Sequence, residues 1–306
     1  MSRPPRSRPP GPRSPARSPA GPAPSGPRGA KGRPPTRAGK PPRSADRAPG
    51  GARRPASARG DERLLYGLHA VAEAWANPER VCRSLRATDR ALEALAPALA
   101  RARAQGLARP EPEVVERERL DRLTGDAVHQ GVVVEVEPLP PVDLDDLGRA
   151  AEVDGRCLAL VLDRVTDPHN VGAILRSATV FGARAVIVPD RHAPPITATL
   201  AKTASGAVEH VWLIRVTNLA KALEALKTWG FRVVGLAEEA EATLAEVELG
   251  ARTALVLGAE GEGLRRLTRD TCDALARLPT GGPIGSLNVS NAAAVALYEA
   301  VRRAPG

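Results

Sequence analysis

Residues 278–298, LPTGGPIGSLNVSNAAAVALY, form the stretch that decides how the rest of this chain is interpreted. The segment opens on a glycine-rich loop, in which backbone groups can approach a ligand without an intervening Cβ. Four residues of the kinds that cap helix N-termini follow, namely Ser286, Asn288, Ser290 and Asn291. The remaining residues are small and compatible with a helix that packs closely on another backbone. The pattern predicts a glycine loop that leads into a buried C-terminal helix.

Two further clusters of glycine and polar residues lie upstream, at residues 257–264 (LGAEGEGL) and residues 167–177 (DPHNVGAILRS). Each follows a run of apolar residues. Unbroken apolar runs predict strands that are buried on both faces, as in a parallel sheet covered by helices. Five such runs are expected as strands: Cys157–Leu162, Ala185–Val188, Val211–Val216, Phe231–Leu236 and Ala254–Leu257. Ligands of open parallel sheets bind at the carboxyl ends of the strands, so we expect the three clusters to lie close together there.

Charge and proline content set the first 60 residues apart from the rest of the 306-residue chain. They hold 13 Arg, 2 Lys and one acid, a net charge of +14, and because the whole chain carries +9, the other residues carry −5. They also hold 16 of the 30 prolines and almost no large apolar side chain. Such a composition cannot bury a core, so residues 1–62 are predicted to be a disordered tail. It could bind RNA by releasing counterions, or serve as a solvated linker with no partner.

The folded remainder divides at a proline-rich stretch. We predict a small α/β domain at residues 63–137, a linker at 138–155 and a second domain at 156–306. Six elements are expected in the small domain, with helices at Tyr66–Trp75, Ala91–Gln105 and Glu116–Leu123 and strands at Val81–Ala87, Pro112–Val115 and Gly131–Val136.

Other features narrow the class of protein. No apolar run approaches the roughly 18 residues that span a bilayer, and no secretory segment is found, so a soluble protein without membrane contact is expected. The three cysteines show no CxxC spacing, and Cys157 opens an apolar run, which favours buried thiols in a reducing cytoplasm. No metal site is predicted.

Three side chains in the upstream clusters are candidates for chemistry. Arg176 lies in a helix that must cover a sheet, and a guanidinium there suits a phosphate or a carboxylate. Asn170 could act in the site or simply cap that helix, whereas His169 is expected at the surface. Glu260 lies in a glycine loop that lacks the Lys-Ser/Thr of a phosphate-binding loop and the spacing of GxGxxG. It is better suited to a hydroxyl or a cationic centre.

Three sequences together resemble the signature motifs of the SpoU, or TrmH, family of RNA ribose 2'-O-methyltransferases in the SPOUT superfamily: NVGAILRSA (170–178), LGAEGEGL and LPTGGPIGSLNVS (278–290). The resemblance covers residues 157–303. GLHAVAEAW and HQGVVVEV (129–136) resemble the ribosomal-protein-like substrate-recognition module of the family. The combination is most similar to members that methylate a guanosine ribose in the peptidyl-transferase P-loop of bacterial 23S rRNA.

The resemblance implies more than the residues themselves predict. It implies a parallel sheet whose C-terminal segment threads a loop to form a trefoil knot, bound S-adenosylmethionine, and a homodimer. It assigns three residues to the cofactor, which are Gly258, Leu278 and Leu287. It assigns five residues to the active site, which are Asn170, Arg176, Glu260, Ser286 and Asn288.

Roles for the five follow from chemistry. Arg176 would hold a phosphate and stabilise charge on the 2'-oxygen, because a guanidinium donates hydrogen bonds and is a poor base. Asn170 and Glu260 would orient it and the ribose, and Ser286 and Asn288 would belong to a network on the cofactor side. Two residues depart from the family pattern, Thr280 and Gly285.

Three other functions stay open from the sequence. A tRNA ribose methyltransferase of the same family would share every active-site residue. A non-catalytic RNA-binding protein would fail to bind the cofactor. An NAD-dependent enzyme is disfavoured because no glycine fingerprint follows the first strand of the second domain.

Overall fold

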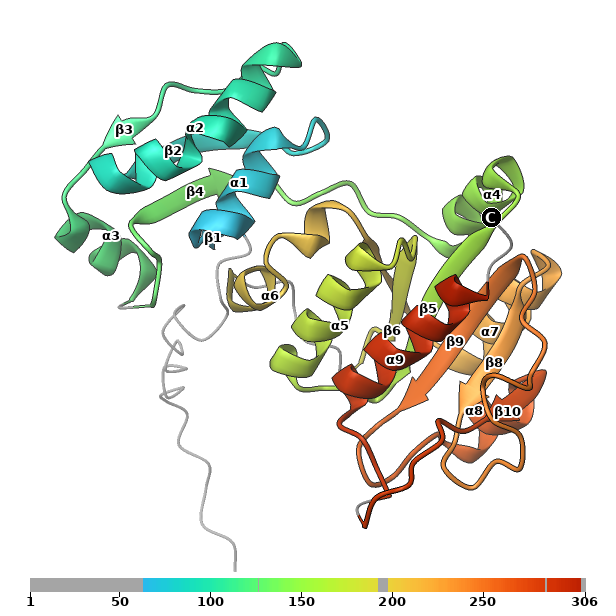
Figure 1. The fold of residues 1–306 in the computed structure, drawn as a ribbon. Coiled ribbons are helices and arrows are strands. Elements are labelled where there is room, and N and C mark those ends of the chain that lie inside the picture. The colour runs from blue at the N-terminus through green and yellow to red at the C-terminus, as the bar shows by residue number, and fades with distance from the viewer. Residues whose placement is uncertain (1–62, 126, 192–197, 284, 304–306) are drawn as a thin grey trace, which may run out of the picture. The chain divides into compact units, whose positions relative to one another are not determined.

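The computed structural model describes residues 63–125, 127–191, 198–283 and 285–303 (Figure 1). The predicted basic tail at residues 1–62 lies outside these ranges, so its disorder and its RNA contact stay predictions. Two sheets organise the described part of the chain, one of four strands and one of six.

The first domain is built on the four-stranded sheet, whose strand order is β1-β4-β2-β3. Strand β4 pairs antiparallel with β1 and β2, and β3 lies parallel to β2. The buried core includes Leu85, Leu95 and Val134. The elements in chain order are β1 (Leu64–Tyr66), α1 (Leu68–Ala76), β2 (Cys82–Ala87), α2 (Asp89–Ala104), β3 (Glu113–Val114), α3 (Arg117–Thr124) and β4 (Val132–Val136). The six predicted elements are all present, with shifts of at most two residues at their ends.

The first helix begins later than predicted, because residues 64–66 form strand β1. The Leu65 side chain is buried while its two neighbours are partly exposed, which is the alternation of a strand with one covered face. Gly67, with φ of 96°, then breaks the extended chain before α1 begins at Leu68.

The predicted linker at 138–155 is too long, because helix α4 (Leu144–Asp154) occupies most of its second half. A capping box starts this helix: the Asp143 side chain accepts from the Asp146 amide at 2.9 Å, and the Asp146 side chain accepts from the Asp143 amide at 3.0 Å. Leu147 and Ala151 are fully buried in the core of the second domain. Burial of these apolar side chains favours a docked helix over a free linker.

The second domain contains a six-stranded sheet in the order β10-β8-β9-β5-β6-β7, and every pair in it is parallel. The predicted parallel α/β architecture is therefore confirmed. Its elements are β5 (Cys157–Asp163), α5 (Pro168–Val180), β6 (Ala185–Pro189), α6 (Ala198–Thr203), β7 (Trp212–Val216), α7 (Leu219–Thr228), β8 (Arg232–Leu236), β9 (Arg252–Gly258), α8 (Arg266–Thr271), β10 (Ala274–Ala276) and α9 (Val289–Arg302).

Helices cover both faces of this sheet, and each strand contributes alternate residues to the two cores. In β5, Leu160 and Leu162 pack with α5, α6 and α9, whereas Ala159 and Val161 pack with α4 and α7. All four side chains are fully buried. Burial on both faces explains why the strands appear in the sequence as continuous apolar runs.

The strand order brings distant parts of the chain together at one edge of the sheet. Strand β9 follows β8 in the sequence but lies between β8 and β5, and β10 pairs on the outer side of β8. Helix α9 then returns across β9 to pack against α5 (Figure 1). Because the strands are parallel, the segments after β5, β9 and β10 all leave from the same edge.

Candidate active site

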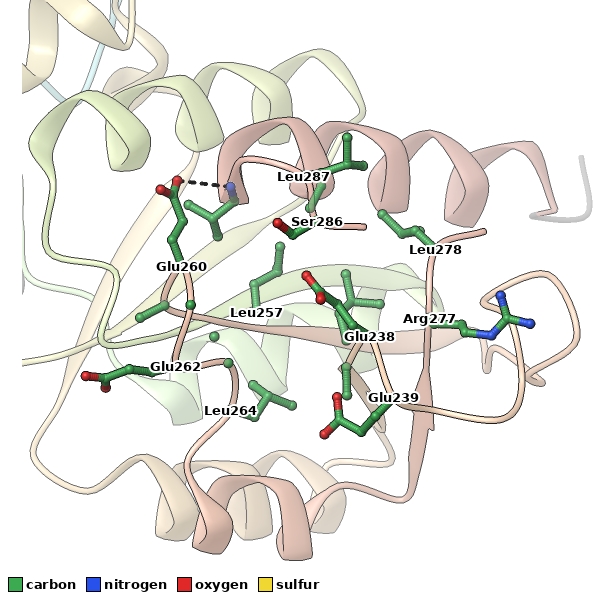
Figure 2. Close-up of a pocket in the computed structure, with 18 of the residues that line it drawn as sticks. Glu238, Glu239, Leu257, Glu260, Glu262, Leu264, Arg277, Leu278, Ser286 and Leu287 are labelled. Carbon is green, nitrogen blue, oxygen red and sulfur yellow. Dashed lines mark hydrogen bonds between the residues drawn. The ribbon is translucent and has the colours of Figure 1, made fainter. Parts of the chain in front are cut away.

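A cavity of about 540 Å³ opens at this edge, lined by the segments that follow β8, β9 and β10 (Figure 2). The volume is in the range of sites for small organic ligands. Part of its wall is apolar, contributed by Leu236, Leu257, Leu264, Leu278, Leu287, Val289 and Ala292. Two of the motifs singled out in the sequence, 257–264 and 278–290, supply most of the lining.

The three predicted polar residues Asn170, Glu260 and Asn288 meet beside the cavity. Asn170 donates from Nδ2 to the Glu260 carboxylate at 3.2 Å, and Asn288 donates from Nδ2 to Asn170 Oδ1 at 3.0 Å. Asn288 also donates to Glu260 Oε1, and the amide of Val289 donates to the same oxygen at 3.3 Å (Figure 2). Each of the three comes from a different motif, separated by 28 to 118 positions in the chain.

Local structure explains why Glu260 can occupy this position. Asn288 is the N-cap of α9, and its Oδ1 accepts from the Ser290 amide at 3.0 Å. The first turn of a helix carries free amides and partial positive charge, both of which favour a carboxylate there. Glu260 therefore lies at the N-terminus of α9, held by one backbone donor and two side-chain amides.

The glycine loop that carries Glu260 turns very tightly. An added Cβ at Gly258 would lie 2.1 Å from the Gly263 carbonyl carbon, a distance that no real side chain tolerates. Ala259 and Gly263 form an isolated antiparallel bridge, which closes the loop on itself. Gly261 and Gly263 have φ values of 79° and 64°, so both positions favour glycine. The loop thus needs its glycines for its own geometry.

Two ion pairs join this loop to the end of β5, and neither was predicted from the sequence. The Asp163 carboxylate is fully buried and accepts from Arg265 Nε at 2.6 Å and from the Arg265 amide at 3.1 Å. Arg164 Nη1 contacts Glu262 at 3.1 Å. An acid at the last position of an apolar strand was the available signal, because a buried carboxylate needs a partner.

The remaining predicted residues divide into two groups. Ser286 and the three predicted cofactor residues, Gly258, Leu278 and Leu287, line the cavity. Arg176 does not: it is exposed on α5 and, within the part of the chain that the structure describes, it makes no hydrogen bond or ion pair with the cluster. His169 is exposed, as expected. The structure brings together four of the five predicted active-site residues and leaves Arg176 apart.

Charged residues after β8 also line the cavity and were missed by sequence analysis. They are Glu238 and Glu239, and Glu239 forms an ion pair with Arg269 of α8. Their only sequence signal is their position just after an apolar strand, at the edge where ligands of parallel sheets bind.

The described residues contain neither a group of three or more potential metal ligands nor a helix long and apolar enough to cross a membrane.

Family models match both domains. The model of the SpoU rRNA Methylase family matches residues 157–298, and a model described as RNA 2'-O ribose methyltransferase substrate binding matches residues 64–142. The first match includes every strand of the six-stranded sheet, and the second includes every strand of the four-stranded sheet.

Individual proteins agree with the models over most of the chain. The chain is 42% identical over 241 residues to the 23S rRNA (guanosine-2'-O-)-methyltransferase RlmB of Salmonella typhi, covering 78% of this chain and 98% of the relative. The RlmB of Vibrio cholerae is 43% identical, covering 78% and 96%. The crystal structure of the SpoU methyltransferase AviRb from Streptomyces viridochromogenes in complex with AdoMet superposes with a TM-score of 0.63 at 28% identity, covering 78% of this chain and 89% of that chain. With two matching domain models and relatives of this identity along nearly their whole length, the chain belongs to the SpoU rRNA Methylase family.

Proposed function

We propose that this protein transfers a methyl group from S-adenosylmethionine to the ribose 2'-hydroxyl of a guanosine in 23S rRNA, in the peptidyl-transferase P-loop. One observation carries the proposal: Asn170, Glu260 and Asn288, one from each motif, meet at the rim of a ligand-sized cavity. The names of the relatives supply the guanosine and the rRNA. The reaction would take place in the cytoplasm during ribosome maturation.

The cavity suits the cofactor in volume and in chemistry. Its leucines form an apolar wall for the adenine. Gly258 has no side chain, so the backbone at Gly263 can lie directly against it. Gly258, Leu278 and Leu287 would hold the adenosine part. Bound S-adenosylmethionine supplies an electrophilic methyl group. The acids of the lining suit a cationic ligand better than an anionic one.

The residues of the chain would position the acceptor. Asn170, Asn288 and the Val289 amide all donate to Oε1 of Glu260. Among the described residues no donor contacts Oε2, which would orient a ribose hydroxyl. Ser286 lines the cavity next to this network. Fixed orientation of the two reacting groups provides much of the acceleration in such reactions.

Arg176 would bind the RNA phosphate and stabilise negative charge on the 2'-oxygen as the proton leaves. Because it is exposed and apart from the cluster of its own chain, we infer that it completes the site only in a homodimer. Helix α5, which carries it, packs against α9.

The outer faces of these two helices support the homodimer. Val180 at the end of α5 and Val295, Tyr298 and Val301 on α9 are 43% to 71% exposed, and Phe181 contacts the Tyr298 ring edge-on at 6.3 Å. Exposed apolar side chains gathered on packed helices are typical of protein interfaces. A second copy of the chain is the partner that we propose.

We also infer that the C-terminal segment is knotted. The insertion of β9 between β8 and β5, the parallel bridge between Thr243 and Arg277, and the return of α9 across β9 support such a path. Knots are rare enough that family membership is needed beside these observations.

The first domain would bind the rRNA, as the family model for residues 64–142 indicates.

The proposed function can be tested directly with 23S rRNA from cells that lack the protein. The RNA is incubated with the purified full chain and S-adenosylmethionine, and ribose methylation is then mapped at nucleotide resolution. One new methylated guanosine in the P-loop is expected. Methylation of tRNA instead would replace the proposal by the tRNA alternative, and cofactor binding without any methylation would refute it.

A further inference from the structure

The lining of the cavity carries an excess of negative charge. It includes four acids, Glu238, Glu239, Glu260 and Glu262, and two bases, Arg269 and Arg277. Charged walls raise the local concentration of ligands of the opposite sign. A carboxylate acts most strongly on a ligand when no other group of the protein offsets its charge.

Three of the four acids already have partners. Glu239 pairs with Arg269, and Glu262 pairs with Arg164 at 3.1 Å. Glu260 accepts from two asparagine side chains and a backbone amide. These contacts offset part of the charge of the three carboxylates.

Glu238 differs from the other three. Within the described ranges its carboxylate has no hydrogen bond and no ion pair, and Figure 2 shows it pointing into the cavity toward Ser286. Arg277 extends away from it in the same view. Its negative charge therefore acts on whatever occupies the cavity.

We propose that Glu238 makes the cavity distinguish the methylated cofactor from its demethylated product by charge. S-adenosylmethionine carries a sulfonium, an ammonium and a carboxylate, a net charge of +1. S-adenosylhomocysteine has a neutral thioether in place of the sulfonium and a net charge of zero. A carboxylate facing the cavity attracts the first and gains little from the second. This inference rests on the proposed function, because it assumes that the cavity holds this cofactor.

A second role for Glu238 would leave a different signature. A carboxylate can also accept hydrogen bonds from the two ribose hydroxyls of an adenosine, as acids after strands do in dinucleotide-binding folds. Both ligands contain that ribose, so the loss of such bonds would weaken both equally. Charge selection weakens only the cationic ligand.

Isothermal titration of the full-length Glu238→Gln variant tests the proposal with three ligands. They are S-adenosylmethionine, S-adenosylhomocysteine, and sinefungin, in which an amine-bearing carbon replaces the sulfonium. Glutamine keeps the shape of the side chain and removes its charge. The Kd of each of the two cationic ligands should rise about three- to tenfold, as expected when one partly solvent-exposed charge is removed. The Kd of S-adenosylhomocysteine should stay unchanged.

Salt and a matched variant complete the design. The ratio of the product Kd to the cofactor Kd should fall as NaCl rises in the wild type, and should respond less in the variant. Glu241→Gln removes an exposed charge three residues away that does not line the cavity, and should change none of the three constants.

Two results would overturn the assignment. Equal weakening of all three ligands would mean ribose binding, and no change in any of them would mean that Glu238 has no role in the cavity. Both results leave the methyltransferase proposal standing. A wild-type chain that binds none of the three ligands would instead refute the proposed function itself.

Discussion

Asp163 ties the end of the glycine loop to the end of β5. Its carboxylate is fully buried at the end of β5 and accepts two hydrogen bonds from Arg265, across 102 positions of sequence. A buried acid held in this way fixes the base of the loop that carries Glu260. The role is one of positioning, because Asp163 does not line the cavity.

Asp163→Asn should therefore loosen the loop without altering the lining. We expect a loss of about 2 kcal/mol in the free energy of unfolding, because a charged hydrogen bond becomes a neutral one in a buried setting. Cofactor affinity should fall as well. Urea unfolding and calorimetric titration measure the two effects. Asp270→Asn breaks the exposed ion pair with Arg266 and should change stability by less than about 0.5 kcal/mol. Equal effects of the two variants would contradict the role.

Arg176 provides the test of the proposed chemistry. Arg176→Lys keeps the charge but loses the planar fork of donors, so methyl transfer should fall about a hundredfold, as when a donor to a developing oxyanion is removed. Cofactor affinity should stay unchanged, because Arg176 does not line the cavity. Wild-type turnover would remove Arg176 from the mechanism.

Mixing inactive Arg176→Ala and Asn288→Ala chains should restore part of the activity if two copies share a site.

The glycine loop between β9 and α8 is the element with the least room for change. Gly258→Ala would force a Cβ to within 2.1 Å of the Gly263 backbone. We expect the free energy of unfolding to fall by about 2 kcal/mol or more, and cofactor binding to be lost as well. Gly281→Ala, in the loop before α9, brings the new Cβ within 4 Å of no described residue other than its chain neighbours. Thermal unfolding should distinguish the two variants, with Gly281→Ala close to the wild type.

Elements that are buried on both faces could be predicted from the sequence, and short or edge elements could not. The run Cys157–Leu162 lies within β5 almost residue for residue, since every position in it packs against helices. Strand β10 has only three residues, two half-buried and one buried, on the edge of the sheet, which is too few for a pattern. Helix α4 was not predicted, because the proline-rich stretch before it was interpreted as a linker. The cluster of Asn170, Glu260 and Asn288 was reached through the family motifs. For Asp163 and Glu238 the only local signal was a position at the end of an apolar strand. The pairing of Asp163 with Arg265 and the direction of the Glu238 side chain depend on strand order and side-chain orientation, which no local pattern encodes.

The proposed homodimer places the outer face of α9 in the contact between the two copies. Val295 is 45% exposed in the centre of α9, and Val295→Asp would place a charge in the proposed interface. We expect the variant to sediment as a monomer and to lose methyl transfer while it stays folded. Val153→Asp changes an 87% exposed valine on α4 and should leave the assembly intact. An unchanged sedimentation coefficient for Val295→Asp would exclude α9 from the interface.

Stability of the whole molecule should fall in alkaline solution because of its thiols. Burial raises the pKa of both Cys82 and Cys157 to about 11, from 9.0. Above pH 9 the unfolded chain loses these protons while the folded chain keeps them, so the unfolded state is favoured as the pH rises toward 11. Urea unfolding at pH 8 and pH 10 should show the decline. It should be shallower when both cysteines are replaced by alanine; an equal decline would assign it to other groups.

Asn288 begins the helix whose outer face we assign to the dimer, and the same side chain holds Glu260 beside the cavity. Any ligand that steadies Glu260 also steadies the first turn of α9. Binding of S-adenosylmethionine in the cavity and dimerisation then share one coupling free energy, so each strengthens the other by the same factor. At low protein concentration, a saturating amount of the donor should therefore raise the fraction of paired chains.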